Sequence, residues 1–442
     1  MEYKYIERHV DKELVSWKND DEKKPLLLRG ARQVGKSSAV RKLAEHFDYF
    51  IEINFEFQKE LVSLFEQSQN PQEICSKLSV IFNTPIEPNK TLLFLDEIQA
   101  CIPAISSLRF FYEKYPELHV IAAGSLLEFA LHELPSFGVG RIRSIFMYPF
   151  SFDEFLNAQG EILLVKEKKE ANSDKPLIKP FHDKLINYLK TYLIIGGLPE
   201  VVRKYVTSKD FLQCQKILQD LIVTYTDDFA KYKKRFSPSL INKVLVAVAK
   251  NVGTKFMYSN VSENTKSHQV KEALELLVMA GLVIPITHSS GNGLPLGADT
   301  NDKFRKFIMF DTGIQQMLLG LAIGEIFLHD TFEVINKGFI AETFAGLEFI
   351  KYQSCYQRSA LYYWQREEKS GNAEVDYLVQ RQNKVLPVEI KAGTKGSMQS
   401  LYYFMDKKKI ETAVRSSNEN FAKYENVEIV PLYALSNLYT LK

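Results

Sequence analysis

Residues 25–38 read PLLLRGARQVGKSS, and the pattern G-x-x-x-x-G-K-[ST] runs from Gly30 to Ser37. The apolar residues before Gly30 predict a buried strand that leads into a loop, and a helix is expected from Lys36 onward. Glycine lets such a loop turn its N–H groups toward phosphates, and the helix directs its positive dipole end at the same charge. We expect Lys36 to reach the β- and γ-phosphates and Ser37 to hold Mg²⁺. A chance glycine-rich turn is the alternative, and the strand and helix around the loop argue against it. The stretch therefore predicts a nucleotide site made of Gly30, Ala31, Arg32, Gln33, Val34, Gly35, Lys36, Ser37 and Ser38.

The composition is that of an ordinary globular chain. The 442 residues are 45% hydrophobic and 25% charged, with a formal net charge of +2. This length predicts about two to four domains, and the nearly neutral charge requires that any nucleic-acid surface be a local patch. Because no apolar run reaches the length of a membrane span and no signal peptide is recognisable, we expect a cytoplasmic location without membrane contact. The four cysteines are far apart without a C-x-x-C pair, which indicates neither a disulfide framework nor a zinc site.

A second stretch, TLLFLDE at residues 91–97, predicts a fully buried strand that ends in two acids. Asp96 is placed to bind the water shell of Mg²⁺, and Glu97 to orient and polarise the water that attacks the γ-phosphate. Three further strands are expected, at residues 49–54, 119–123 and 144–148. Ser125 follows the second of these three strands and could sense the γ-phosphate. Strands that alternate with helices predict a parallel sheet covered on both faces, with ligands at the carboxyl ends of the strands.

These motifs resemble the AAA+-type ATPases in which a P-loop core is joined to a C-terminal DUF4143 domain. The resemblance also rests on Ala123-Gly124-Ser125, Gly140-Arg141, YPFSFDEF at residues 148–155 and GGLPE at residues 196–200. It implies a P-loop ASCE/AAA+ core over residues 1–152 that hydrolyses ATP with Mg²⁺. It also implies an arginine finger that reaches a neighbouring subunit's nucleotide, with Arg141 as first candidate and Arg143 as second, so that a homo-oligomer is expected. Ordinary salt bridges of these two arginines are the alternative.

A helical lid is expected over residues 153–236, where the apolar pattern becomes helical. Within it, the GGLP stretch resembles the G-x-P element that nucleotide-switch ATPases place against the adenine, which makes Pro199 a nucleotide contact. Most AAA+ proteins carry a lid arginine near this point, and its absence here favours a slow, nucleotide-gated switch over a fast motor. Arg203 could partly replace that arginine or lie at the surface.

A winged-helix-like domain is predicted over residues 237–330, where helix-length segments precede two strands around a Gly- and Ser-rich turn. Such a module either binds DNA or packs domains together. Just upstream, FAKYKKRF at residues 229–236 interleaves cations with aromatic residues. That stretch would either grip a phosphate backbone or form a solvated helix end.

The C-terminal domain, residues 331–442, places acids on predicted strands. Two strands joined by a short polar connection are expected at residues 373–379 and 385–391. If the tip of this hairpin lies at residues 382–383, Asp376 is opposite Glu389, whereas a slip of one residue would separate them. Two facing carboxylates predict a Mg²⁺ or Mn²⁺ site. Lys391 would lower the pKa of the attacking water or stabilise the transition state.

This arrangement resembles the PD-(D/E)xK nuclease superfamily. Asp376, Glu389 and Lys391 match its core motif, Glu342 matches its first-helix acid, and QSLYY at residues 399–403 is similar to its Q-x-x-x-Y element. The resemblance implies an α/β, restriction-endonuclease-like domain that acts on nucleic acid, DNA in the first place. The chain is therefore predicted to be an α/β multidomain ATPase whose nucleotide state controls a nuclease-like domain. The alternative is a regulatory switch in which that domain binds DNA or a protein partner without cutting.

Overall fold

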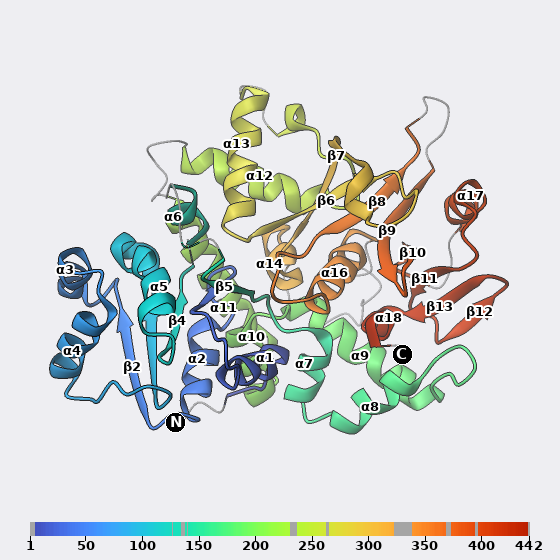
Figure 1. The fold of residues 1–442 in the computed structure, drawn as a ribbon. Coiled ribbons are helices and arrows are strands. Elements are labelled where there is room, and N and C mark those ends of the chain that lie inside the picture. Colours follow the sequence, from blue (N-terminus) through green and yellow to red (C-terminus); the bar gives the residue numbers. More distant parts are fainter. Residues whose placement is uncertain are drawn as a thin grey trace. The chain divides into compact units, whose positions relative to one another are not determined.

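The structure is a computed structural model that describes residues 5–125, 127–133, 138, 140–229, 237–261, 265–321, 338–367, 373–393 and 397–440. It contains two compact units (Figure 1). Unit 1 is Met1–Tyr148 with Ser354–Arg358, and unit 2 is Pro149–Gln353 with Ser359–Lys442. Within the described ranges, every helix is too short or too polar to cross a membrane.

Unit 1 is built on a five-stranded sheet in the order β2-β3-β4-β1-β5. The strands are β1 (Leu26–Arg29), β2 (Tyr49–Asn54), β3 (Thr91–Asp96), β4 (His119–Ala123) and β5 (Arg143–Phe146). Neighbouring strands are parallel, as predicted. Helix α1 (His9–Lys18) precedes the first strand, and the helices between the strands are α2 (Lys36–Ala44), α3 (Val62–Gln67), α4 (Pro71–Phe82), α5 (Ile102–Lys114) and α6 (Leu127–Glu133). This parallel sheet core confirms the predicted fold class for the first part of the chain.

The sheet gathers the predicted nucleotide-site residues at one edge. β3 and β4 are buried along their whole length, which is why they read as unbroken apolar runs. Parallel strands end on the same side, so the segments that follow β1, β3 and β4 come together there. Those segments begin at Gly30, Glu97 and Gly124.

Unit 2 begins with a helical part. Its helices up to the first strand are α7 (Phe152–Ala158), α8 (Ile162–Glu170), α9 (Lys179–Ile195), α10 (Pro199–Ser208), α11 (Phe211–Asp228), α12 (Pro238–Lys250) and α13 (Ser267–Met279). The cation-rich part of the predicted FAKYKKRF stretch lies outside the described residues. The later helices are α14 (Thr312–Leu318), α16 (Gly338–Lys351), α17 (Gln399–Lys408) and α18 (Asn437–Thr440).

A mixed eight-stranded sheet forms the rest of unit 2, in the order β12-β13-β11-β10-β9-β8-β6-β7. The strands are β6 (Val283–Ser289), β7 (Thr300–Met309), β8 (Leu361–Gln365), β9 (Glu374–Arg381), β10 (Lys384–Ile390), β11 (Ala413–Ser417), β12 (Ala422–Tyr424) and β13 (Val427–Pro431). The α/β class predicted for the C-terminal part is confirmed.

The β6–β7 hairpin pairs with the C-terminal strands rather than ending a separate sheet. β6 lies parallel to β8, with Ile286 opposite Leu361. The predicted boundary between residues 330 and 331 therefore cuts through one continuous sheet. Local periodicity shows that a strand exists, but it does not show which distant strand will occupy its open edge. The helices and hairpin expected from residue 237 are present, and a winged-helix role for them stays a prediction.

Candidate functional site

The loop after β1 has backbone geometry that requires its glycines. Gly30 has φ +139°, and a Cβ there would lie 2.2 Å from the carbonyl oxygen of Met147. Gly35 has φ 94° in the left-handed region and directly precedes α2, which starts at Lys36. A loop so constrained presents the first N–H groups of α2 at its open end, the arrangement that binds anions.

Lys36 folds back onto this loop. Its side chain is buried, and Nζ donates to the carbonyl oxygens of Gly30 at 2.9 Å and Ala31 at 2.8 Å. Burial lowers the pKa of Lys36 to about 8, although Glu97 and Asp96 act in the opposite direction. A triphosphate would add negative charge beside this amine and favour its charged form, so the residues fit such a ligand.

Two oxygen donors suited to Mg²⁺ lie together beside the loop. Ser37 Oγ donates to Asp96 Oδ2 at 2.9 Å, and Asp96 Oδ1 accepts from the N–H of Glu97 at 3.1 Å. Asp96 is buried, which raises the pKa of its carboxyl, while the Ser37 hydrogen bond lowers it. A hydroxyl and a carboxylate side by side are the ligand type that Mg²⁺ takes in phosphate sites, so these two residues fit the ion.

The carboxylate of Glu97 is fixed by two neighbours. Oε2 accepts from Gln99 Nε2 at 2.7 Å, and from the N–H and Oγ of Ser125 at 3.4 Å and 3.3 Å. A Cβ on Gly124 would lie 2.1 Å from Gln99 Oε1, so this position has no room for a side chain beside the amide. Ser125 therefore contacts the acid that follows β3, and its role as a γ-phosphate sensor stays a prediction. The sequence analysis did not identify Gln99 as a partner of Glu97. The only indication in the sequence was that Gln99 lies two residues after Glu97.

The two candidate arginine fingers make contacts within unit 1. Arg141 forms an ion pair with Glu113, with both side chains well exposed at 49% and 38%. Arg143 Nη1 lies 2.9 Å from Asp20 Oδ2. These are the salt bridges that the sequence left open as an alternative, and exposed pairs of this kind are weak. The finger role of Arg141 stays a prediction.

In unit 2, the GGLP stretch is held by close packing. A Cβ on Gly196 would lie 2.1 Å from Asp311 Oδ1, and one on Gly197 would lie 2.5 Å from the carbonyl oxygen of Phe150. The N–H of Gly197 donates to Asp311 Oδ2 at 2.7 Å, and its carbonyl accepts from the N–H of Phe150 at 2.7 Å. Pro199 occupies the first turn of α10, where its missing N–H is not needed. Close packing therefore explains why both positions are glycine, and the adenine contact of Pro199 stays a prediction.

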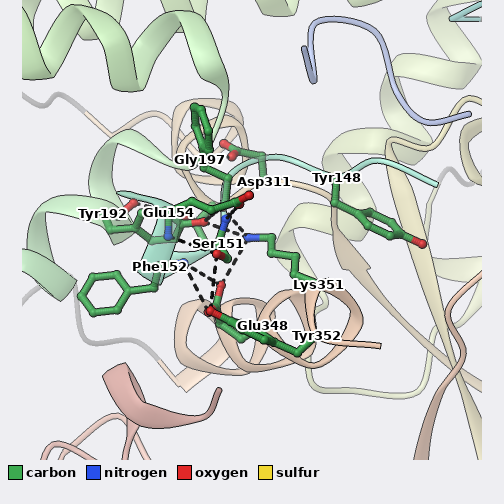
Figure 2. A network of polar contacts seen from close by, with 12 residues as sticks. Tyr148, Ser151, Phe152, Glu154, Tyr192, Gly197, Asp311, Glu348, Lys351 and Tyr352 are labelled. Atoms are coloured by element: carbon green, nitrogen blue, oxygen red, sulfur yellow. Dashed lines mark hydrogen bonds and ion pairs between the residues drawn. The ribbon is translucent and has the colours of Figure 1, made fainter. Parts of the chain in front are cut away.

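A buried polar network surrounds this stretch (Figure 2). Lys351 Nζ donates to the carbonyl oxygen of Phe150 at 2.9 Å and to the hydroxyl of Tyr192 at 2.8 Å, and lies 3.4 Å from Glu348 Oε1. Glu348 also accepts from the N–H of Phe152 at 3.2 Å. Burial raises the pKa of Glu348 to about 7 and lowers that of Lys351. The sequence did not reveal this network, because a Glu and a Lys three residues apart on a helix usually form a surface pair.

The hairpin that carries the predicted nuclease-like acids has the predicted register. Lys384 pairs with Arg381 and Val388 pairs with Tyr377, and residues 382 and 383 at the tip both have positive φ. The ladder ends at this pair, and the same register continued by one residue would place Asp376 opposite Glu389, so that the facing of the two acids stays a prediction. Asp376 Oδ2 also accepts from the N–H of Ile390 at 2.7 Å.

Four carboxylates and two lysines act on one another around this hairpin. We call this group the carboxylate cluster: Glu342, Glu374, Asp376, Glu389, Lys306 and Lys391. Lys391 Nζ lies 2.5 Å from Glu389 Oε1. Burial and then the charge of Asp376 raise the pKa of Glu342 to about 8 and that of Glu389 to about 7. All four predicted residues thus belong to one electrostatic group.

Two members of the cluster were missed in the sequence. Lys306 lies on β7 and forms an ion pair with Glu374 at the start of β9. Neither belongs to a motif, and the pairing of β6 with β8 was not foreseeable from periodicity. Among the described residues, no three His, Cys, Asp or Glu side chains converge as metal ligands. A metal held by Asp376 and Glu389 would thus have to complete its shell with water or substrate oxygens, as Mg²⁺ commonly does.

Three family models match parts of the chain. Residues 22–156 match an AAA domain (AAA_14), residues 186–323 match a domain of unknown function (DUF8612), and residues 337–435 match another domain of unknown function (DUF4143). No curated protein matches the chain.

Solved structures that resemble the chain include three archaeal proteins. The alignment with a Walker-type ATPase of Pyrococcus abyssi covers 71% of this chain and 96% of that protein, with 17% identity and a TM-score of 0.44. Cdc6p of Pyrobaculum aerophilum covers 63% and 88%, with 14% identity and a TM-score of 0.28. The ORC1 protein of Aeropyrum pernix, in complex with DNA, covers 73% and 95%, with 13% identity and a TM-score of 0.30.

The family matches agree with the parallel sheet and the phosphate loop of unit 1 and with the mixed sheet of unit 2. They confirm the resemblance to AAA+-type ATPases with a C-terminal DUF4143 domain, and the resemblance to the nuclease superfamily stays a prediction. The chain carries an AAA-type ATPase domain within residues 22–156 and a DUF4143 domain within residues 337–435.

Proposed function

We propose that this protein is an ATP-hydrolysing switch whose nucleotide state controls a C-terminal domain that acts on nucleic acid. The observation that carries the first half is the loop site. Lys36 lies buried on the phosphate loop, Ser37 lies beside Asp96, and Glu97 is fixed at the end of the same strand. A phosphate-binding loop with a positioned acid supports hydrolysis rather than binding alone.

Each residue has one task in this proposal. The loop N–H groups and Lys36 hold the phosphates, and Ser37 with Asp96 would hold Mg²⁺, which neutralises charge on the phosphate oxygens. Glu97 orients and polarises the attacking water, while Gln99 and Ser125 keep its carboxylate in place. Gln99 and Ser125 are therefore positioning residues.

Hydrolysis is tested with paired variants of the full chain. Glu97→Gln is expected to bind ATP normally and to hydrolyse it about 100-fold more slowly or worse, since it removes the general base. Lys36→Ala is expected to lose binding as well. Glu87→Gln is a matched control, because Glu87 pairs with Lys90 at the surface. Normal hydrolysis by Glu97→Gln would refute the proposed role.

A homo-oligomer with Arg141 as finger belongs to the same proposal, by the AAA+ resemblance. The test mixes Arg141→Ala with Glu97→Gln, each inactive alone. Sites that combine an intact Glu97 from one subunit with an intact Arg141 from its neighbour would regain hydrolysis. If the mixture stays as inactive as its parts, the finger is elsewhere or absent.

The buried polar network supports the control step. Its members come from all three matched segments: Phe150 and Phe152 from the first, Tyr192, Gly197 and Asp311 from the second, and Glu348 and Lys351 from the third. Phe150 lies two residues after Tyr148, where the first segment of unit 1 ends. A change that moves this linking segment would thus act directly on α16 of the DUF4143 domain.

The carboxylate cluster supports a phosphodiester-cleaving site, with Asp376 and Glu389 holding Mg²⁺ or Mn²⁺ and Lys391 stabilising the transition state. The alternative is that the domain binds DNA or a protein partner without cutting. The ion pair of Lys306 with Glu374 favours this alternative, because it supplies a cation without metal.

A cleavage assay separates the nuclease from the binding module. The wild type and Lys391→Ala are each incubated with linear, circular and single-stranded DNA in the presence of Mg²⁺ or Mn²⁺. Cleavage lost in the variant supports the nuclease, and no cleavage of any substrate supports the binding module.

A further inference from the structure

A short segment of the DUF4143 domain belongs structurally to unit 1. Residues 354–358 lie between α16 and β8 and within the DUF4143 match, but they are part of the compact unit that contains the phosphate loop. The chain therefore passes between the two units after residues 148, 353 and 358. Ordering so short an excursion costs conformational entropy, so contacts with unit 1 must hold it in place. We call residues 354–358 the strap.

Hydrogen bonds fix the first part of the strap. The carbonyl oxygen of Cys355 accepts from the N–H of Phe146 at 2.8 Å. Phe146 is the last residue of β5, an edge strand of the sheet, and edge strands carry unpaired N–H groups that another chain segment can occupy. The hydroxyl of Tyr356 donates to Glu13 Oε2 on α1 at 2.7 Å. The strap is thus bound to both the sheet and the first helix of unit 1.

Arg358, at the end of the strap, shares Glu128 with Arg29. Arg358 Nη2 lies 3.1 Å from Glu128 Oε2, and Arg29 donates to both oxygens of the same carboxylate at 2.6 Å and 2.5 Å. The two guanidinium carbons lie 4.8 Å (Arg29) and 5.9 Å (Arg358) from the ring centroid of Phe146. The Arg358 side chain is 46% exposed, against 16% for Arg29 and 18% for Glu128. Arg358 can therefore leave for solvent while Glu128 keeps a charged partner.

The strap is connected to the nucleotide site through the main chain. Phe146, which binds the strap, directly precedes Met147, whose N–H donates to the carbonyl oxygen of Arg29 at 2.8 Å. The carbonyl oxygen of Met147 lies against Gly30, where a Cβ would be only 2.2 Å away. The end of β5 thus contacts the strap through Phe146 and the start of the phosphate loop through Met147.

A second connection leads to the acid that is proposed to orient water. Glu128 lies on α6, three residues after Ser125. The N–H and Oγ of Ser125 donate to Glu97 Oε2 at 3.4 Å and 3.3 Å. A strap that holds Glu128 therefore also supports the segment that contacts Glu97.

We propose that the strap positions the nucleotide site, with Arg358 acting through Glu128, so that strap docking and nucleotide binding favour each other. The inference rests on the ATPase half of the proposed function and adds the segment through which the DUF4143 domain regulates that site. Because coupling between two sites is reciprocal, bound nucleotide holds the strap on unit 1, and a displaced strap weakens nucleotide binding by the same factor. Arg358 is therefore a positioning residue.

The thiol of Cys355 reports strap docking in the full chain. Burial raises its pKa to about 11, so alkylation by N-ethylmaleimide is slow while the strap is docked. Peptide mass spectrometry separates Cys355 from the buried Cys75, Cys101 and Cys214. Saturating ATPγS with Mg²⁺ should slow the labelling of Cys355 about fivefold. Arg358→Met should be labelled faster, should lose this nucleotide effect and should bind ATPγS about fivefold more weakly.

Three variants show that the effect passes through the proposed contact. Lys384→Met removes an exposed cation of the same domain, paired with Glu411, and should behave as the wild type. Arg358→Lys keeps the charge and should restore the nucleotide effect on labelling. In a Glu128→Gln background, Arg358→Met should change the affinity for ATPγS less than twofold, because the shared partner is already lost.

The possible results decide the inference separately from hydrolysis. If ATPγS binds but leaves the labelling of Cys355 unchanged, or if Arg358→Met binds it as tightly as the wild type, the inference is overturned. Faster labelling of the three buried cysteines in Arg358→Met would indicate general destabilisation and would also overturn it. If Arg358→Met fails to fold by circular dichroism, Arg358→Gln carries the same expectation. Binding and protection without ATP hydrolysis would refute the proposed hydrolysis and leave the strap in place, whereas no binding of ATPγS would overturn both.

Discussion

The phosphate loop and the carboxylate cluster are both buried sites of concentrated charge, but with opposite sign. In the loop, one lysine lies among carbonyl oxygens, and burial lowers its pKa to about 8. In the cluster, four carboxylates share two lysines, and burial raises the pKa of Glu342 to about 8. The first site is suited to gain an anion, and the second is suited to gain a cation.

The two sites also differ in how the protein itself balances their charged groups. Lys36 satisfies its ammonium with two loop carbonyls, which are replaceable contacts within one turn of chain. The cluster instead uses side chains from β7, β9, β10 and α16, so its charges are balanced only after distant segments have folded together. A site formed by one short segment can be recognised in the sequence. A site assembled from distant segments cannot, because any one motif contains only some of its residues.

The largest effect should be the pH dependence that Glu342 imparts to stability. Its pKa is about 8 in the folded protein and near 4.5 when unfolded, so the folded state holds an extra proton between these values. The free energy of unfolding therefore falls as pH rises through this window. Glu342→Gln should have the same free energy of unfolding as the wild type at pH 4 and a clearly higher one at pH 9 in metal-free buffer. Urea denaturation measures this.

Glu272→Gln provides the control for this experiment, because Glu272 is exposed on α13. Its difference from the wild type should be small at both pH values. A Glu342→Gln difference that is the same at pH 4 and pH 9 would mean that Glu342 is ionised alike in both states, and the contrast between the two sites would fail.

Next in size is the loss of nucleotide affinity in Lys36→Ala. Removing the buried amine should raise the dissociation constant of a fluorescent ATP analogue about 100-fold, which equals about 2.7 kcal/mol. Lys42→Ala, in an exposed pair with Glu45 on the same helix, should change it less than twofold. Equal affinities of the two variants would contradict the loop site.

Much of the fold was predictable because its signals are local. The β9–β10 register followed from the tip at residues 382–383, and β3 followed from an apolar run that ends in Asp96. The ion pair of Lys306 with Glu374 and the network around Lys351 could not be predicted, because each depends on contacts between distant segments. For the same reason, the sequence suggested a boundary where the sheet continues.

The GGLP stretch gives a smaller effect and separates packing from ligand contact. Gly197→Ala would press a Cβ against the carbonyl oxygen of Phe150, and overpacking of this kind destabilises by about 1–3 kcal/mol. Thermal melting should show that loss, while nucleotide affinity stays within twofold. Gly338→Ala is the control, since a Cβ at that position would have no neighbouring atom within 4 Å among the described residues. Loss of affinity without loss of stability would instead support the adenine contact at Pro199.

The smallest effect belongs to the surface pair of Arg141 with Glu113. Because both side chains are well exposed, solvent screens their attraction, and Arg141→Ala should lower the free energy of unfolding by no more than about 1 kcal/mol. Urea denaturation of Arg141→Ala beside Glu113→Gln checks this, and a loss above about 2 kcal/mol in either would contradict it. Breaking such an exposed ion pair requires little free energy. Such a weak pair agrees with the arginine-finger role that we propose for Arg141, whereas Lys36 and Lys306 are buried in their contacts.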